Sequence, residues 1–586
     1  MSIQAGEARS AVARQRNWSK PRLWQSAVFI TVLLAVIGPL AFLLLGSFSS
    51  ARMPSEFWSS SLTLLNHMKV WGDTGTYSVL SNTVVFAAGS TLFGLVTAVA
   101  LAWFVERTDM PGKLWVYATL PLTLAMPGML QAMAWTLLLS PRIGFINKGL
   151  MGAFGLEQAP FDIYSLTGMM FVEGLRTVPT AFLMMAPLLR SMDPALEQAG
   201  YMSGANRRSV LRRISFPLLA PGIAAVAIYQ FTGALEEFEI AGILGMPAGI
   251  FVFSTKIYSA LHATSQLPAY GEANALALLY LLVAIIAVAL YGRVLTRSER
   301  FAVVAGKAYR PSMQPLGPFR IFALGLTWLY LAAAVIIPFL VLVYVSLIPF
   351  VQQPSWRALS SLTLENYEGL LQIDGLENIL WNTFLLTVIV ATASVVVSLA
   401  ISLVVVRTKF SLRRLLDQLS FLPHAIPGMV MGLALTWVFL QLDKLGFGLF
   451  GSLSSVMFAF VVGYISYGTR AMNSSILQIH SELDEAGQMS GATPAQVVWR
   501  ILVPLLTPAF AGVWLWTALH VIRSAGKPLI LTSGSENEVL AVTIWNMWDQ
   551  GYIEAVGAVG VLLMLALALA SFVILKHPVF ARGSET

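Results

Sequence analysis

Residues 196–221 read LEQAGYMSGANRRSVLRRISFPLLAP, and residues 483–508 repeat that segment as LDEAGQMSGATPAQVVWRILVPLLTP. The two copies lie 287 positions apart and share 14 of 26 residues without a gap. The shared positions include serine, glycine, arginine and proline, so a common excess of apolar residues does not explain the match. A polar segment that occurs twice between apolar stretches predicts an internal duplication and a function that is needed twice.

The composition places the chain in a membrane. Its 586 residues are 57% hydrophobic and 11% charged, whereas soluble domains carry about 25% charged residues. The net charge of +7 is distributed between apolar stretches and forms no single basic patch, which argues against a nucleic-acid partner. The absence of cysteine excludes disulfides and thiolate metal sites.

The hydropathy pattern predicts an all-α polytopic membrane protein with the lipid bilayer as its surroundings. A membrane-spanning helix needs about 20 largely apolar residues. Twelve stretches qualify, at about 23–47, 78–104, 115–139, 164–189, 217–235, 274–294, 320–347, 380–405, 415–440, 455–478, 505–525 and 556–575. Lys and Arg gather in the even-numbered connections and acidic residues in the others, which predicts that both termini and both repeated segments face the cytoplasm.

Other short motifs repeat at nearly the same spacing and divide the chain into two halves. Asn-Thr, Arg-Thr and Pro-Gly-Met each occur once per half, at positions 82 and 382, 107 and 407, and 127 and 427. Six spans per half predict two parallel repeats. The expected divisions are a basic cytoplasmic N-terminus (1–22), a first repeat (23–294), a cytoplasmic linker (295–318), a second repeat (319–576) and a cytoplasmic tail (577–586).

Each repeated segment predicts a helix–turn–helix at the cytoplasmic surface. Leucine, alanine and methionine recur three positions apart, so they share one helical face. The following glycine, Gly204 or Gly491, suits the left-handed conformation that ends a helix. A second short helix is expected to run to Pro217 or Pro504, where the next span begins. One copy alone could rest on lipid, but two matching Ser-Gly-Ala turns favour a pair of docking surfaces for two identical partners.

The segments resemble the EAA loop of ABC importer permeases: Glu-Ala-Ala, three residues, Gly, nine residues, Ile, one residue, a hydrophobic residue and Pro. The second copy supplies Glu485, Ala486, Gly487, Gly491, Ile501 and Pro504. The first supplies Gln198, Ala199, Gly200, Gly204, Ile214 and Pro217, with the acidic Glu197 one place early, so the two docking surfaces are expected to be unequal. The twelve-span duplication and the linker stretch 300–311 resemble the fused two-domain permeases of the ferric-iron type.

This resemblance implies a type I ABC importer permease of the bacterial inner membrane. It implies a homodimeric ATP-binding subunit on the cytoplasmic loops and a periplasmic substrate-binding protein outside, with ferric iron as the first choice of cargo. The chain has no Gly-x-x-x-x-Gly-Lys-Ser/Thr loop, so ATP and Mg²⁺ are expected on the partner, and no enzyme activity or cofactor is expected here. Related permeases handle thiamine, polyamines and phosphonates.

Charged residues near the outer ends of two spans are candidates for a substrate pathway. Glu236, Glu237 and Glu239 lie where the fifth span ends, and Arg523 aligns with Glu236 at the end of the eleventh, with His520 one turn earlier and Lys527 beside it. Charge in a bilayer is costly, so these groups either bracket the substrate, form a gating ion pair or lie in water at the interface. No resident metal site is expected, because the six histidines are scattered and the methionines do not cluster.

Three further groups favour structural roles. Glu173 and Arg176 lie three residues apart and are expected to pair on one helical face. His424, between two prolines, is expected to be a hydrogen-bonded histidine at a kink. The Pro-Gly pairs at 127–128 and 427–428 break the helix and are interpreted as hinge or pathway elements.

Two rival functions remain at this point. A secondary transporter of six-plus-six design could couple to protons through Glu173, Glu236 or His424, but an ion-driven carrier needs no paired docking surface. A membrane-embedded enzyme would need clustered histidines and carboxylates at ligand spacing, which the sequence does not provide.

Overall fold

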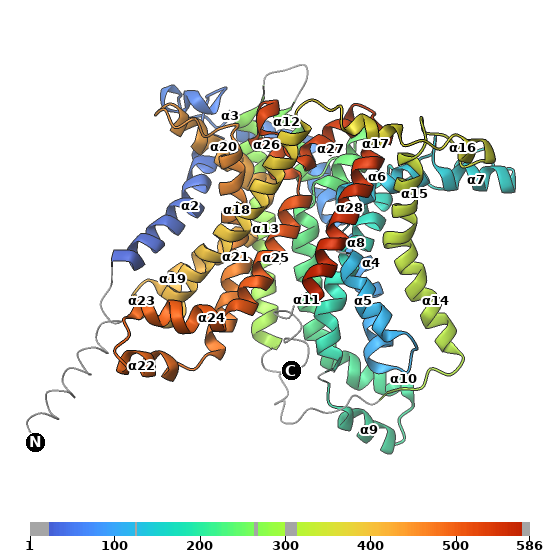
Figure 1. The fold of residues 1–586 in the computed structure, drawn as a ribbon, viewed down its shortest axis with the longest axis horizontal. Helices are drawn as coiled ribbons and strands as arrows, with labels where there is room; N and C mark the ends of the chain where they lie inside the picture. The colour runs from blue at the N-terminus through green and yellow to red at the C-terminus, as the bar shows by residue number, and fades with distance from the viewer. Residues whose placement is uncertain (1–22, 124–125, 191, 263–267, 299–312, 577–586) are drawn as a thin grey trace, which may run out of the picture.

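The computed structural model describes residues 23–123, 126–190, 192–262, 268–298 and 313–576, and its regular elements are helices (Figure 1). In the first half the long helices are α2 (Leu23–Ser47), α4 (Thr74–Arg107), α5 (Lys113–Thr123), α6 (Gly128–Leu139), α8 (Leu166–Arg190), α11 (Phe216–Glu236) and α13 (Tyr270–Ser298). The second half contains α14 (Phe319–Leu331), η7 (Ala332–Ile336), α15 (Ile337–Ser346), α18 (Leu376–Ser402), η8 (Leu403–Arg407), α19 (Arg413–Phe421), α20 (Gly428–Asp443), α21 (Leu453–Gln478), α25 (Thr507–Arg523) and α28 (Ile553–Lys576). The predicted N-terminus 1–22, tail 577–586 and most of the linker (299–312) lie outside the described residues.

Helices occupy all twelve predicted spans, but not all are single straight helices. Among the described residues six helices are long and apolar enough to cross a membrane, and three more candidates are pairs bent by more than 40°. The predicted span 415–440 is bent by 110° at its Pro-Gly pair, and span 115–139 is interrupted between α5 and α6 at the equivalent pair. Another bent pair, Ala241–Ala248 with Phe253–Leu261, was not predicted as a helical element.

The first helix of each half packs against the other half. Helix α2 lies along α20, and the Gln441 side-chain amide of α20 donates to the carbonyl of Pro54 just beyond α2. Helix α15 packs against α6 of the first half as well as against α28 of its own half. In Figure 1 α2 and α15 lie at opposite flanks of the bundle. The two halves are therefore interlocked in one fold.

The entry to α14 is bound to the first half by Asp109. One carboxylate oxygen accepts from Arg320, and the other accepts from the backbone N–H of Leu316 at 2.9 Å. The bond from Arg320 is the main cause that lowers the Asp109 pKa from 3.8 to about 2. The pKa of Asp109 is lower in the folded protein than in the unfolded one, so its bonds stabilise the fold fully above about pH 4. This stabilisation is lost as the pH falls through about 2.

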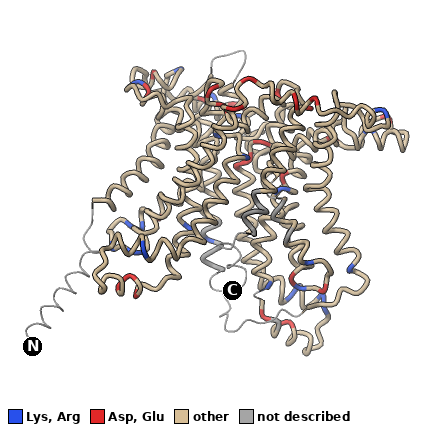
Figure 2. The backbone as a smooth tube through the Cα atoms, in the orientation of Figure 1, with Lys and Arg blue, Asp and Glu red and all other residues tan. Residues whose placement is uncertain are grey.

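Charge separates along the bundle as the sequence predicts. Figure 2 shows acidic residues along the upper edge, with some Lys and Arg at its two ends, and clusters of Lys and Arg beside the acidic residues of the duplicated segments at the lower corners. The lower end is therefore the side that the distribution of positive charge assigns to the cytoplasm.

The duplicated Asn-Thr pairs hold equivalent helices at the upper end. The Thr83 hydroxyl accepts from the Phe253 backbone N–H and the Thr383 hydroxyl from that of Leu540, both at 2.9 Å. These two N–H groups begin α12 (Phe253–Leu261) and α27 (Leu540–Asp549), whose first turns have no intrahelical partner. The repeat of this motif is thus explained by helix capping.

Close packing of α4 on α8 depends on glycine. A Cβ atom on Gly94 would contact the Thr177 hydroxyl and lie 3.0 Å from the carbonyl oxygen of Gly174. Gly94→Ala is therefore expected to lower the free energy of unfolding by about 1–3 kcal/mol. Thermal unfolding in detergent measures this, with Gly38→Ala as the control, because no atom lies within 4 Å of that Cβ position. Equal melting temperatures for the two variants would contradict the packing argument.

Candidate functional site

A cavity of about 490 Å³ lies between the two halves. Its charged lining includes every predicted pathway residue: Glu236, Glu237, Glu239, His520 and Arg523. Glu173 and Arg176 on α8 and Tyr464, Tyr467 and Arg470 on α21 also line it. These polar residues lower the hydropathy of α8 and α21, which are not among the helices counted above as apolar enough to cross a membrane. Whether cargo touches this lining stays a prediction.

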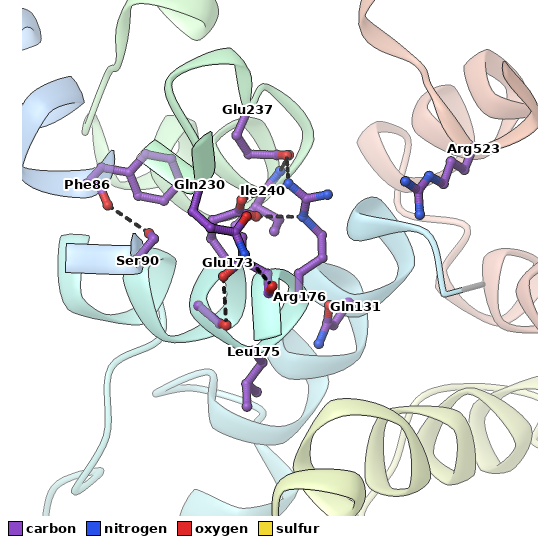
Figure 3. A network of polar contacts seen from close by, with 12 residues as sticks. Phe86, Ser90, Gln131, Glu173, Leu175, Arg176, Gln230, Glu237, Ile240 and Arg523 are labelled. Atoms are coloured by element: carbon purple, nitrogen blue, oxygen red, sulfur yellow. Dashed lines mark hydrogen bonds and ion pairs between the residues drawn. The ribbon is translucent and has the colours of Figure 1, made fainter. Parts of the chain in front are cut away.

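The first-half wall is organised around Arg176. Its guanidinium donates to both oxygens of Glu173, at 2.6 and 2.7 Å, and to Glu237 at 2.8 Å (Figure 3). The pair of Glu173 with Arg176 is therefore confirmed. The Glu173 side chain is fully buried, and a buried carboxylate needs such a charged partner. Glu237, considered from sequence as a possible partner of Arg523, is held by Arg176 of its own half.

The other two glutamates differ in what they contact. One Glu239 oxygen accepts from the Ala525 backbone N–H at 2.9 Å, which links the outer ends of the two halves directly. The Glu236 side chain is exposed to the cavity. Among the described residues no hydrogen bond or ion pair engages its carboxylate. Lys527 in the same lining interacts with Glu236 electrostatically but does not form a hydrogen bond to it, which leaves the Glu236 carboxylate accessible to a ligand.

In the second-half wall, His520 holds Arg523. Its Nδ1 lies 2.7 Å from the carbonyl oxygen of Trp516, and its Nε2 lies 2.7 Å from an Arg523 nitrogen. A carbonyl only accepts, so Nδ1 carries the proton and Nε2 accepts from the guanidinium. Both ring nitrogens are engaged by protein, so His520 positions Arg523 and is not placed to bind a metal.

Aromatic rings cover much of the same wall. Trp516 is sandwiched between Tyr467 and His520, with ring centroids 3.8 and 3.9 Å away. The Lys527 ammonium lies over the faces of Phe460 and Tyr464, at 4.8 and 4.9 Å. Sequence reasoning placed Lys527 only beside Arg523 and assigned it no role, because a contact with rings more than 60 positions away has no local signal.

The prediction for His424 was wrong in its contacts. In the described chain this residue makes no hydrogen bond; its ring stacks on Tyr229 of the first half at 6.0 Å and contacts Phe421 at 5.5 Å. The break of the span in η9 (Leu422–Ala425) directs the ring into the cavity lining rather than towards a backbone partner.

The duplicated Pro-Gly pairs bring two helix starts to the cavity. Gly128 begins α6 and Gly428 begins α20, and both line the cavity. A Cβ atom would lie 3.2 Å from the Arg176 side chain at the first position and 3.4 Å from that of Lys527 at the second. Glycine therefore leaves room for the two cationic side chains, which favours the interpretation as pathway elements.

Among the described residues no group of three or more His, Cys, Asp or Glu side chains is arranged to hold a metal ion.

The repeated segments adopt the predicted turn in both halves. The first helices are α9 (Pro194–Met202) and α22 (Glu482–Met489), and each ends in a left-handed glycine, Gly204 at φ +81° and Gly491 at φ +88°. The residue after each glycine donates to the carbonyl five positions back, Ala205 to Gly200 at 3.1 Å and Ala492 to Gly487 at 3.0 Å. This hydrogen bond is the Schellman closure of a helix.

A second glycine in each segment explains the motif's isoleucine. A Cβ atom on Gly200 would lie 2.8 Å from Ile214, and one on Gly487 would lie 2.9 Å from Ile501. The isoleucine of the following helix thus packs directly on the glycine of the first. The spacing between them fixes the shape of the helix–turn–helix.

The segments leave equivalent apolar side chains in solvent. Met202 is 90% exposed and Met489 is 76% exposed, and Leu196 and Leu483 are 43% and 45% exposed. The remaining docking positions on the first helices, Gln198, Ala199, Glu485 and Ala486, are exposed too, whereas Glu197 is buried. Glu197, also a predicted docking position, is bound inside the protein by Arg107.

The helices that follow the turns differ between halves. The prediction of a separate short helix before each proline is wrong for the first half, where one continuous helix runs from Arg207 to Glu236 past Pro217. In the second half the chain bends by 70° between Pro494–Leu505 and Thr507–Arg523. Closely similar sequences thus adopt a straight and a bent form.

Comparison with known proteins agrees with this architecture. The chain matches the family described as binding-protein-dependent transport system inner membrane component twice, over residues 90–300 and 395–578. It is 26% identical to the ferric transport system permease protein FbpB of Actinobacillus pleuropneumoniae, over 86% of this chain and 72% of that protein.

Two Haemophilus influenzae proteins are also similar. A putative ferric transport system permease protein, FbpB 1, is 27% identical over 76% of this chain and 68% of its own length. An Fe(3+)-transport system permease protein, FbpB 2, is 20% identical over 85% and 90%. Such relatives are permeases and are not themselves enzymes. With two family domains over most of its length, the chain belongs to the inner membrane components of binding-protein-dependent transport systems.

Proposed function

We propose that this chain is the translocation subunit of an ATP-driven importer that carries ferric iron from the periplasm to the cytoplasm. The observation that carries the proposal is the pair of matching segments, α9 and α22, which expose equivalent leucine and methionine side chains on the side opposite the acidic edge. A monomeric soluble surface rarely exposes such side chains without a partner. Two equivalent segments suit two copies of one ATP-binding subunit, which would hold the ATP and Mg²⁺.

Ferric iron as cargo is supported by the names of the relatives and by the chemistry of the lining. Hard cations prefer oxygen ligands, and Glu236 offers a carboxylate in the cavity between the halves. The lining also contains the charged groups of Arg176, Arg523 and Lys527. A periplasmic binding protein would deliver the ion to the outer end of this cavity, and both termini would lie in the cytoplasm.

An organic cation, such as thiamine or a polyamine, is the second candidate. The stacked rings of Tyr467, Trp516 and His520 and the ring of Tyr464 line the cavity. Aromatic faces bind organic ammonium groups by cation–π attraction, which makes this cargo class the alternative to test.

Reconstitution tests the function. Proteoliposomes would contain the permease with its ATPase subunit facing the lumen, and binding protein loaded with ⁵⁵Fe³⁺ would be added outside. We expect iron uptake that requires ATP in the lumen. Excess thiamine or spermidine should leave iron uptake unchanged. Uptake driven by a proton gradient without nucleotide would overturn the importer assignment. Inhibition of iron uptake by thiamine or spermidine would assign the cargo to the organic cations instead of iron.

The turn glycine offers a specific test of the docking segments. Gly491→Val places a β-branched residue at φ +88°, which costs about 1–2 kcal/mol and distorts the turn. We expect roughly tenfold weaker co-purification of the ATPase and reduced uptake. The matched control is Gly155→Val, because Gly155 also has a positive φ (+66°) and open space but lies after α7 (Phe145–Phe154), near the opposite edge. Loss of the ATPase in both variants would argue against a local docking role.

A further inference from the structure

The duplicated Arg-Thr pair lies where each half meets its docking segment. Arg107 is the last residue of α4 and binds Glu197 of α9; Arg407 is the last residue of η8, and its Nε lies 3.2 Å from Asp484 of α22. Glu197 and Asp484 occupy equivalent positions, 287 residues apart. The arginine–acid contact is thus a pair of equivalent joints between a spanning helix and a docking segment.

The adjacent threonines place both arginines in the same way. The Thr108 hydroxyl donates to the carbonyl of Phe104 at 2.5 Å, and the Thr408 hydroxyl donates to that of Val404 at 2.7 Å. Each threonine oxygen also accepts from the backbone N–H two residues later, at 3.3 Å. A cation at a helix C-terminus is favoured by the helix dipole. The motif therefore ends the helix and directs the arginine to the docking segment.

Each joint connects the docking segment to the cavity wall through one neighbour. Helix α4 is unbroken from Thr74 to Arg107 and packs along α8, which carries Glu173 and Arg176. In the second half α18 and η8 form one continuous helical segment that packs along α21, which carries Tyr464 and Arg470. A displacement of α9 or α22 would therefore act on the wall through a rigid helix.

The first joint is closed, and both oxygens of its acid accept hydrogen bonds, whereas the buried Arg107 Nε has no partner among the described residues. The side chains of Arg107 and Glu197 are 0% and 2% exposed. The second Glu197 oxygen accepts from the Ser215 hydroxyl at 2.6 Å. Ser215 belongs to the helix that continues into α11, so this joint also binds the segment on the far side of the turn.

The second joint lacks these bonds. The residue equivalent to Ser215 is Leu502, and the shorter Asp484 replaces glutamate. The buried Oδ1 of Asp484 accepts no hydrogen bond from the described residues. Arg407 donates to the carbonyls of Ile479 at 2.7 Å and Ile476 at 3.3 Å, and Arg107 donates to the carbonyl of Met192, the equivalent of Ile479, at 3.5 Å. Burial raises the pKa of the Asp484 carboxyl, which agrees with an incompletely compensated charge. The 70° bend after Leu505 lies in the same half.

We propose that Arg107 and Arg407 are positioning residues that transmit ATPase movement to the cavity wall, and that the first joint is rigid while the second is compliant. This inference rests on the proposed function, because it requires a partner on the docking segments. It predicts that the two halves respond unequally to a symmetric ATPase.

Hydrogen exchange on the purified full-length permease tests the inequality. Backbone amides of 194–203 should exchange about tenfold more slowly than those of 482–491, since charge-assisted bonds resist local opening. Asp484→Glu combined with Leu502→Ser supplies both missing features, and it should slow the second segment to the rate of the first. Glu482→Gln, at an exposed position of the same helix outside the predicted docking residues, is the control and should leave the exchange of both segments unchanged. Equal exchange in the natural protein, or no slowing in the double variant, would overturn the proposal.

Transport stoichiometry tests transmission. In the reconstituted complex Glu197→Gln should lower the amount of cargo moved per ATP by about tenfold, and Asp484→Asn by about twofold, with the ATPase still bound in both. A bound ATPase with an unchanged ratio in Glu197→Gln would refute the joint. An ATPase that fails to bind the natural permease would instead refute the proposed function, so the two failures are distinguishable.

Discussion

Met202→Glu combined with Met489→Glu is expected to abolish ATPase binding and ATP-dependent uptake. The two methionines are the most exposed apolar side chains of the docking segments, at 90% and 76%. Central apolar anchors of an interface contribute about 2 kcal/mol each, which is roughly thirtyfold in affinity per site. A buried unpaired carboxylate at each site adds a desolvation penalty. Co-purification of the ATPase with the tagged permease measures the loss.

The control for this variant is Met68→Glu. Met68 is 68% exposed in α3 (Leu65–Gly72), on the opposite edge of the bundle. It introduces the same charge on a comparably exposed methionine, so it should leave the ATPase bound. Because neither methionine is buried, the double variant should melt at the temperature of the natural protein. Undiminished co-purification from the double variant would remove α9 and α22 as the docking surface.

The shape of the docking segments could be predicted from sequence because it is local. A glycine that needs a positive φ and an isoleucine that packs on a second glycine both act within 15 residues. The burial of Glu197 could not be predicted in this way, since its partner Arg107 lies 90 positions earlier and belongs to another helix. The acidic residues at the equivalent positions 197 and 484 could be seen in the two copies, but the sequence did not show that the Glu197 side chain points into the protein.

Prediction of the cavity from sequence is limited in the same way. Alignment of the halves placed Glu236, Glu237 and Arg523 at equivalent levels, and all three line the cavity. Which carboxylate pairs with which arginine depends on side-chain reach across helices, and Arg176 was the nearer partner of Glu237. Likewise, equivalent proline-containing segments form a straight helix in one half and a 70° bend in the other. Sequence alone gives both the same expectation, because tertiary contacts decide between them.

Glu236→Gln and Glu237→Gln are expected to separate cargo binding from structural support. Glu237 is bound by Arg176 at 2.8 Å and its other oxygen accepts from the Ile240 N–H at 3.1 Å. Removing its charge should lower the free energy of unfolding by about 1.5–3 kcal/mol. No hydrogen bond or close ion pair from the described residues holds Glu236, which interacts with Lys527 only at longer range, so Glu236→Gln should change the melting temperature less than Glu237→Gln and reduce iron uptake by about tenfold or more.

The two effects are distinguishable kinetically. If Glu236 attracts the cation into the cavity, Glu236→Gln should act on iron transport at limiting loaded binding protein, while ATPase co-purification remains normal because α9 and α22 lie at the other end of the bundle. Glu157→Gln, an exposed carboxylate in an outer connection, is the matched control and should transport normally. Normal uptake by Glu236→Gln would exclude this carboxylate from the pathway. It would leave Arg176, with its two buried partners, as a structural element that shapes the cavity without contacting cargo.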